Sequence, residues 1–149
     1  MRERVEAVVK EVARDTVAFR GHPMVRSLHP TTIEVTTEEH LTERGDCIIG
    51  VRAEKGCLQL DEAVKSGLRK AGTRVRFRIV VGDESFVVGA WGDPRLQLTH
   101  PGEIVIRKSQ FVSERTVAVG ADAAARDIPR SIVEELSRGV AGALEIEVG

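Results

Sequence analysis

The stretch GHPMVRSLHPTTIEVTTEEHLTER, residues 21–44, recurs 71 positions later as GDPRLQLTHPGEIVIRKSQFVSER, residues 92–115. Seven of the 24 positions are identical without a gap, and they hold glycine, proline, histidine, isoleucine, glutamate and arginine. Chance composition rarely aligns such residue types. The sequence therefore predicts an internal duplication within one domain of residues 1–149, with repeats at approximately 13–81 and 84–148 and an N-terminal extension at 1–12.

The same order of elements is expected in both repeats: strand, loop with GxP and HP, strand, strand, helix, strand. Alternating apolar residues predict strands, and helical spacing preceded by Asp61 or Pro129 predicts helices. The strands are expected at residues 16–20, 32–36, 47–53, 73–81, 85–90, 103–107, 116–121 and 143–148, and the helices at 61–71 and 129–138. Residues 2–13 fit a helix or a strand, with a slight preference for helix.

This order of elements predicts a β-rich α+β fold. Two copies of about 70 residues are too few for a solenoid, which usually needs at least three repeats. A pseudo-two-fold fusion is expected instead, with a sheet that is curled or barrel-like and two main helices. A cradle-loop barrel of the double-psi kind is the alternative, by analogy of element order.

Composition narrows the class of protein. Apolar residues make up 42% and charged residues 30%, which is ordinary for a soluble globular chain. The net charge of −1 argues against coating nucleic acid or an anionic membrane through bulk electrostatics. No stretch is apolar enough to span a membrane, so a cytoplasmic location is expected. Cys47 and Cys57 lack a metal-binding spacing and are expected to be reduced thiols.

At the level of motifs the chain resembles an archaeal family known as domain of unknown function 371 (DUF371). The first half carries Gly21-His22-Pro23, His29, Thr31 to Thr36, Leu41-Thr42 and Arg44 to Ile48, and the second half carries His100-Pro101, Ile104 to Ser109 and Arg115-Thr116. The resemblance covers residues 13–148 and implies a small, soluble archaeal protein without an assigned activity. Met24 stands where the family pattern has asparagine after GHP.

Three histidines precede proline: His22, His29 and His100. A following proline restricts the backbone, so each imidazole is presented from a fixed turn. Hydrogen bonding within the turn is one interpretation of these residues, and a catalytic acid or base is another. A divalent metal site is a third, and its ligands would be His22, His29, Asp93 and His100.

The two repeats differ where a ligand would be held. Hydroxyl and carboxyl groups occur in the first repeat, whereas cations occur at the corresponding positions of the second. Arginine forks and lysine bind phosphate or carboxylate groups, although charged residues at a strand end are also ordinary surface residues. The candidate ligand-binding residues are Thr31, Thr32, Glu34, Asp46, Arg107, Lys108 and Ser109.

A second polar cluster is Arg44-Gly45-Asp46-Cys47. Arg44 and Arg115 precede buried strands and are expected to form ion pairs with Glu43, Glu114 or Asp46. Cys47 fits a small buried residue better than a nucleophile. The sequence thus favours a small anionic-ligand or enzymatic site at the duplicated loops. The alternatives are a module that binds RNA or DNA through residues 73–80 and 107–109, and a structural subunit of a larger complex.

Overall fold

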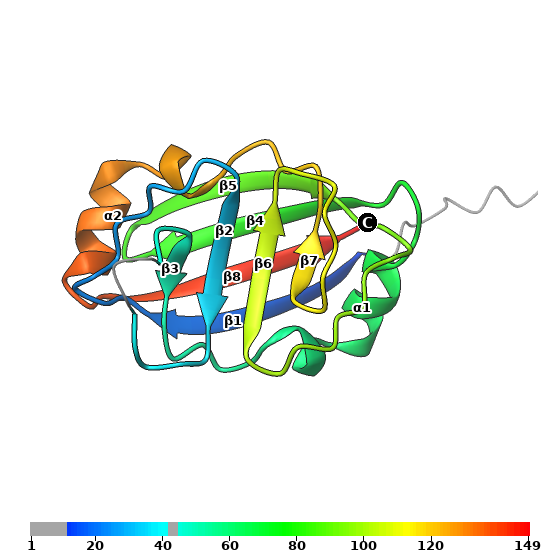
Figure 1. Ribbon diagram of the computed structural model, residues 1–149, viewed down its shortest axis with the longest axis horizontal. Helices are drawn as coiled ribbons and strands as arrows, with labels where there is room; N and C mark the ends of the chain where they lie inside the picture. Colours follow the sequence, from blue (N-terminus) through cyan, green and yellow to red (C-terminus); the bar gives the residue numbers. More distant parts are fainter. Residues whose placement is uncertain (1–11, 42–44) are drawn as a thin grey trace, which may run out of the picture.

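The computed structural model describes residues 12–41 and 45–149, and its elements follow the same order in each half of the chain (Figure 1). The first half contains β1 (Ala13–Arg20), β2 (Thr32–Thr36), β3 (Ile48–Gly50), the 3-10 helix η1 (Cys57–Gln59), α1 (Glu62–Leu68) and β4 (Arg74–Val81). The second contains β5 (Glu84–Trp91), β6 (Glu103–Arg107), β7 (Thr116–Ala118), η2 (Ala125–Asp127), α2 (Arg130–Ser137) and β8 (Ala141–Val148). The bounds of β2 and β6 are those predicted from the sequence.

The long strands form one antiparallel sheet, here called sheet A, in the order β1-β8-β4-β5. Its strands alternate between buried and exposed residues, as expected for a sheet with one face on the core and one in solvent. In β4, for example, Val75, Phe77 and Ile79 are buried, while Arg74 and Arg76 between and beside them are exposed. The alternation predicted for this strand is therefore confirmed.

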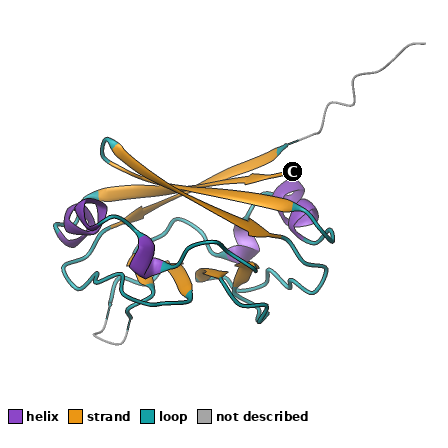
Figure 2. Ribbon diagram, turned by 90° about the horizontal axis from the view of Figure 1, so that it is seen from above, coloured by secondary structure: helices purple, strands orange, loops and turns teal. Residues whose placement is uncertain are grey.

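The short strands form a second, mixed sheet, here called sheet B, in the order β3-β2-β6-β7. β2 and β6 are antiparallel at its centre, and each has a parallel partner at the edge. Ile33, Val35, Ile104 and Ile106 project from the central pair into the core. The strands of the two sheets cross at a steep angle in Figure 1, and Figure 2 shows the sheets as two layers with a helix at each end.

Local sequence explains both helices. The side chain of Asp61 accepts a hydrogen bond of 2.9 Å from the backbone N–H of Ala63, and this cap begins α1. Pro129 occupies the corresponding position before α2. Both helices are shorter than the predicted 61–71 and 129–138, because α1 is already capped at Arg69 and α2 at Arg138.

The prediction of a β-rich α+β fold with two main helices is confirmed. The expectation of a barrel-like sheet and the alternative of a cradle-loop barrel are both not met, because neither sheet closes into a barrel within the described residues. Their edges meet at isolated bridges between Arg20 and Val51 and between Trp91 and Val119. Beyond these bridges, the carboxylates of Glu54 and Asp122 accept hydrogen bonds from backbone N–H groups of the edge strands β1 and β5.

Three sequence predictions remain: the secondary structure of residues 2–13, the state of the two cysteines and the lack of a membrane span. Most of residues 2–13, with their helix-or-strand ambiguity, and residues 42–44 lie outside the described part of the chain. Cys47 and Cys57 are free thiols. No helix in residues 12–41 and 45–149 is both long and apolar enough to cross a membrane.

Candidate functional site

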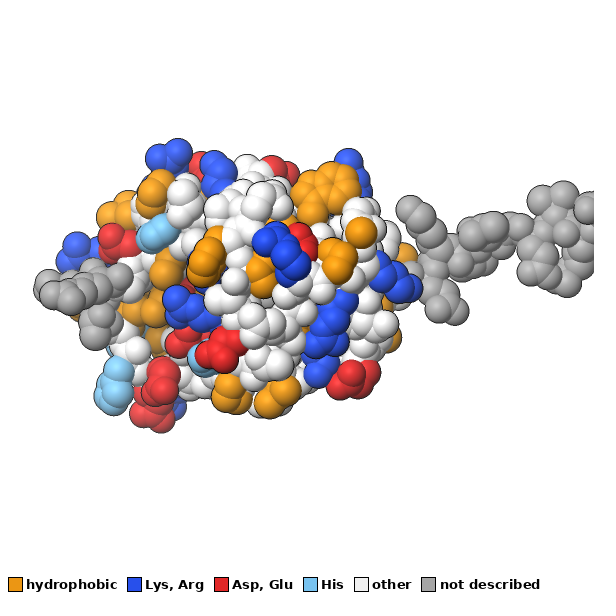
Figure 3. All heavy atoms as spheres, turned by 45° about the vertical axis from the view of Figure 1, so that its right-hand side comes forward, with side chains coloured by type: hydrophobic (Ala, Val, Ile, Leu, Met, Phe, Trp, Pro, Cys, Tyr) orange, Lys and Arg blue, Asp and Glu red, His pale blue; other side chains and the backbone are white. Residues whose placement is uncertain are grey.

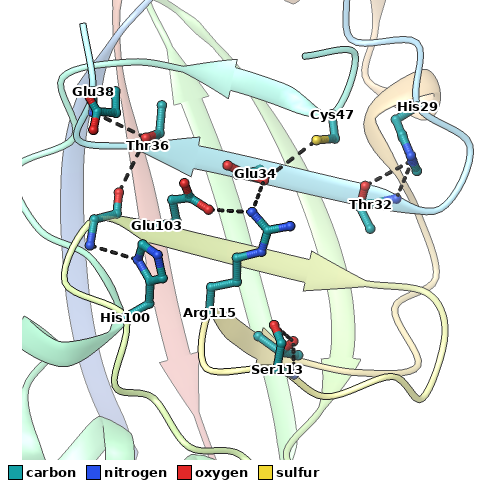
Figure 4. A network of polar contacts seen from close by, with 12 residues as sticks. His29, Thr32, Glu34, Thr36, Glu38, Cys47, His100, Glu103, Ser113 and Arg115 are labelled. Carbon is teal, nitrogen blue, oxygen red and sulfur yellow. Dashed lines mark hydrogen bonds and ion pairs between the residues drawn. The ribbon is translucent and has the colours of Figure 1, made fainter. Parts of the chain in front are cut away.

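The face of sheet B that points away from sheet A carries an unusual number of polar side chains. Pairing of β2 with β6 places Thr32 opposite Arg107 and Thr36 opposite Glu103, with Glu34 between them. Because side chains alternate along a strand, these five residues share one face while their apolar neighbours enter the core. Figure 4 looks onto this outer face of sheet B.

Glu34 is the most buried carboxylate of this face, with a relative exposure of 5%. Burial is the main cause that raises the pKa of Glu34 to about 7, and the negative charge of Glu103 adds to it. Nη1 of Arg115 lies 2.5 Å from Glu103 Oε1 and 3.7 Å from Glu34 Oε1. Arg115 therefore neutralises Glu103 first and leaves Glu34 only partly compensated.

Cys47 lies on the other side of Glu34. Its thiol donates a long hydrogen bond of 3.7 Å to Glu34 Oε1 (Figure 4). Burial, followed by the charge of Glu34, raises the pKa of the Cys47 thiol to about 11. The thiol consequently stays protonated at neutral pH and serves as a donor rather than as an activated nucleophile.

Arg107 is held by hydroxyl groups instead of carboxylates. Its Nε donates to Thr116 Oγ1 at 2.8 Å, and one Nη donates to Ser113 Oγ at 3.2 Å. The guanidinium carbon lies 4.9 Å from the ring centroid of Phe111, a side chain that is 60% exposed. Burial and the nearby Arg115 lower the pKa of Arg107. No acidic side chain of the described residues forms a salt bridge with it.

Each of the three proline-preceding histidines accepts hydrogen bonds from its own loop. Nδ1 of His29 accepts from the backbone N–H groups of Thr31 and Thr32, both at 3.2 Å. Nδ1 of His100 accepts from Gly102, and Nδ1 of His22 accepts from Met24, each at 3.0 Å.

The histidine loops lie apart from one another. His29 and His100 stand at opposite ends of the antiparallel β2–β6 pair (Figure 4), because each precedes the N-terminal end of its own strand. His22 follows the end of β1 and lines a separate cavity of about 360 Å³. The structure therefore does not bring these three imidazoles into one site.

The fourth predicted metal ligand, Asp93, has a different partner. Both of its carboxylate oxygens accept hydrogen bonds of 3.0 Å from the guanidinium of Arg95. Across residues 12–41 and 45–149, no three His, Cys, Asp or Glu side chains gather in a way that could hold a metal ion. His22, His29, Asp93 and His100 thus do not assemble into one ligand set.

The remaining predicted residues lie at the end of the β2–β6 pair where His29 stands. The backbone N–H of Lys108 donates to the carbonyl of Thr31, and the carbonyl of Asp46 accepts from the N–H of His29. Ser109 Oγ accepts from the backbone N–H of Phe111 at 3.3 Å. Beside His29, this end therefore brings together most of the predicted ligand-binding residues, namely Thr31, Thr32, Asp46, Arg107, Lys108 and Ser109.

The sequence did not identify several residues that lie on or beside the outer face of sheet B. Arg115 was expected to pair with Glu43, Glu114 or Asp46, but it pairs with Glu103 and Glu34. Ser113, Thr116 and Phe111, which contact Arg107, were not identified. The alternation of β6 was a usable signal for Glu103, since it places Glu103 on the same face as Arg107.

The surface around the cluster is mixed in charge. Figure 3 views the molecule obliquely from the side of sheet B, and Lys and Arg side chains lie interspersed there with acidic, apolar and uncharged ones. A broad basic field is not seen on this view. The polar side chains on the outer face of sheet B are thus suited to bind a small anionic group rather than a long polyanion.

Comparison with known proteins agrees with the family resemblance that the sequence motifs indicate. Residues 17–149 match the domain of unknown function DUF371. The chain belongs to the DUF371 family. An uncharacterized protein of Methanocaldococcus jannaschii is 39% identical over 123 residues, which cover 83% of this chain and 90% of the relative. Membership in DUF371 places the chain beside an archaeal relative but assigns neither protein an activity.

Proposed function

We propose that the outer face of sheet B binds a small anionic ligand at the end of the β2–β6 pair where Arg107 lies. The observation that carries this proposal is the state of Arg107: it is half-buried, held by two hydroxyls, and has no salt-bridge partner within the described residues. A partly buried cation without a salt-bridge partner is incompletely compensated, so an incoming anion is favoured there.

The groups around Arg107 suit a phosphate or a carboxylate. Its planar guanidinium can bond two oxygens of one group. Lys108, the next residue of the chain, carries a second positive charge at the same end of the strand pair. Thr32 faces Arg107 across the strand pair and supplies a hydroxyl. Because Nδ1 of His29 accepts hydrogen bonds from its loop, the ring proton lies on Nε2, which is then a donor for a ligand.

Glu34 gives the same site a group that exchanges protons near neutral pH. Burial holds its pKa at about 7, which is where a carboxyl group acts most effectively as a general acid or base. The proposed chemistry is therefore binding of an anion by Arg107 and Lys108, with proton transfer to or from Glu34 when a ligand presents an acidic or basic atom.

We also infer that the domain is an internal duplication of residues 13–81 and 84–148, preceded by an N-terminal extension. Several pairs of features separated by 71 positions support it. Ser27 and Leu98 have the same unusual positive φ, 53° and 55°. A Cβ placed on Gly21 or Gly92 would meet the carbonyl oxygen of Leu136 or Leu68, respectively, in the helix of the other half.

This duplication would account for a single anion site instead of two. The two halves make equivalent backbone bonds, since Glu34 N–H donates to the Cys47 carbonyl and Val105 N–H donates to the Arg115 carbonyl. In that correspondence Val105 takes the place of Glu34. Arg115 takes the place of Cys47, whereas the ungapped match of the two stretches aligns it with Arg44. The first half would thus supply the acid and the thiol, and the second half the cations.

Thermal and chemical unfolding in the presence of anions tests the proposed ligand site. We expect inorganic phosphate, a phosphorylated metabolite or a dicarboxylate to raise the free energy of unfolding, by about 2.7 kcal/mol at a hundredfold excess over its dissociation constant. Arg107→Gln and Lys108→Ala should remove the effect. The matched control is Arg95→Gln, which alters an exposed arginine that already has Asp93 as its partner. Equal stabilisation of Arg107→Gln and the wild type would reject the site.

A further inference from the structure

The outer face of sheet A is lined by arginines. β1 contributes Arg14 and Arg20, and β4 contributes Arg74, Arg76 and Arg78. The acidic side chains of this face are Glu145 and Glu147 of β8, which lies between those two strands. Among the described residues no helix covers this face, as the side view in Figure 2 shows.

Two of these arginines are neutralised and three are not. Arg14 pairs with Glu147 and Arg78 pairs with Glu145, each at 3.2 Å. Arg20, Arg74 and Arg76 form no salt bridge with any acidic residue of the described chain. At the rim, Glu54 and Asp122 accept hydrogen bonds from the backbone of the edge strands and keep their negative charge. On the face itself, five arginines of β1 and β4 stand against the two glutamates of β8, which is an excess of positive charge.

An aromatic ring lies at one end of the same face. Trp91 is 40% exposed at the end of β5, and the guanidinium carbon of Arg74 lies 4.8 Å from its ring centroid. A hollow of about 250 Å³ lies farther along the face, and its charged lining comprises Arg14, Arg76 and Arg78 together with Asp15, Glu145 and Glu147. The outer face of sheet A thus carries an aromatic ring and a guanidinium group at one end, and a hollow lined by charged side chains farther along.

We propose that the outer face of sheet A binds single-stranded nucleic acid. Unpaired bases stack on tryptophan rings and on guanidinium planes, and arginines in a row meet the successive phosphates of the backbone. A duplex hides its base faces and would leave Trp91 without a stacking partner. The surface is separate from the proposed anion site, because Arg107 lies on the opposite layer of the molecule.

Emission from Trp91 gives a direct test, because the chain has one tryptophan and no tyrosine. We expect an oligouridylate of about 12 nucleotides to quench the emission at about 50 mM salt. The logarithm of the binding constant should fall with the logarithm of the salt concentration, with a slope near −2 if about three phosphates are neutralised. Absence of quenching at low salt, or quenching that salt does not weaken, would overturn the proposal.

Variants locate the binding surface. Arg76→Gln and Arg20→Gln should each weaken binding several-fold and make the salt slope shallower by about 0.7. Trp91→Ala, followed by the anisotropy of a labelled oligonucleotide, should weaken binding at least about fivefold through lost stacking. Arg126→Gln, which alters an exposed arginine of η2, is the control that should bind as the wild type does. Circular dichroism checks that each variant is folded.

Two other occupants of the face would give different results. A duplex of the same length that binds more tightly than the single strand would overturn the proposal. Self-association through sheet A would appear as a change in Trp91 emission and sedimentation with protein concentration, in the absence of nucleic acid. That result, combined with no effect of the oligonucleotide, would assign the face to a second copy of the chain. Loss of binding in Arg107→Gln would move the nucleic-acid site to sheet B.

Discussion

Arg115 lies closer to Glu103 than to Glu34: its Nη1 is 2.5 Å from the first carboxylate and 3.7 Å from the second. The guanidinium of Arg115 therefore pairs closely with Glu103 and only loosely with Glu34, although Glu34 is the more buried carboxylate. Burial, with the charge of Glu103 added to it, keeps the pKa of Glu34 near 7 although Arg115 is adjacent. The proton affinity of Glu34 thus depends on both neighbours.

The first prediction concerns stability as a function of pH. The pKa of Glu34 is raised from 4.5 to about 7, so between those values the folded state holds a proton that the unfolded state has released. The free energy of unfolding should fall by about 3 kcal/mol as pH rises through this window, and level off above it. Glu34→Gln should not show this fall in the free energy of unfolding, and it should be more stable than the wild type at about pH 8. Urea unfolding across the window measures both chains, and parallel pH profiles would contradict the assignment.

The second prediction concerns the two neighbours of Glu34. Glu103→Gln removes a like charge and frees Arg115 to approach Glu34, so the pKa of Glu34 should fall below 7. Arg115→Gln removes the compensating cation and should raise it. Carboxyl carbon chemical shifts, recorded during a pH titration, report the pKa directly. An unchanged midpoint in both variants would show that burial alone sets the proton affinity.

The third prediction concerns two glycines at close contacts. A Cβ on Gly21 would lie 2.1 Å from the carbonyl oxygen of Leu136, and a Cβ on Gly92 would lie 2.4 Å from that of Leu68. Backbone cannot yield as a side-chain tip does, so Gly21→Ala and Gly92→Ala should each lower the free energy of unfolding by about 3 kcal/mol or more. Gly82→Ala is the control: its Cβ meets no atom, so only the strain of its positive φ, about 1 kcal/mol, is expected. A mild effect at either glycine would refute the equivalence of the two contacts.

Elements with local signals could be predicted from the sequence. Ile33 and Val35 alternate with polar residues and thereby set the bounds of β2. In β6 the apolar residues Ile104, Val105 and Ile106 are bounded by the charged residues Glu103 and Arg107. The strand predicted at 47–53 was too long because the chain leaves the ladder after Gly50 and adopts a positive φ of 51° at Arg52. Nothing in that apolar run indicates where its pairing ends.

The candidate site was predictable only in part, because its geometry depends on strand register. His29 and His100, which occupy matching positions of the repeated stretch, were expected to frame one site, but antiparallel pairing sends the loops before β2 and β6 to opposite ends. Arg115 was matched with acidic residues close in sequence, whereas its partners Glu34 and Glu103 lie on neighbouring strands. Which carboxylate an arginine meets is decided by long-range pairing that a single sequence does not encode locally.

The final prediction concerns the reactivity of Cys47. Burial, followed by the charge of Glu34, raises the pKa of its thiol to about 11. At about pH 8 its thiolate fraction, and so its rate with a disulfide reagent, should be on the order of a hundredfold below that of a free cysteine. Glu34→Gln removes the second cause and should speed the reaction several-fold, while burial keeps it slow. Cys47→Ala isolates the reaction of Cys57, whose thiol is fully buried with a pKa raised to about 12 and should react more slowly still. A Cys47 that reacts as fast as free cysteine would mean that the thiol is neither buried nor held against Glu34 in solution.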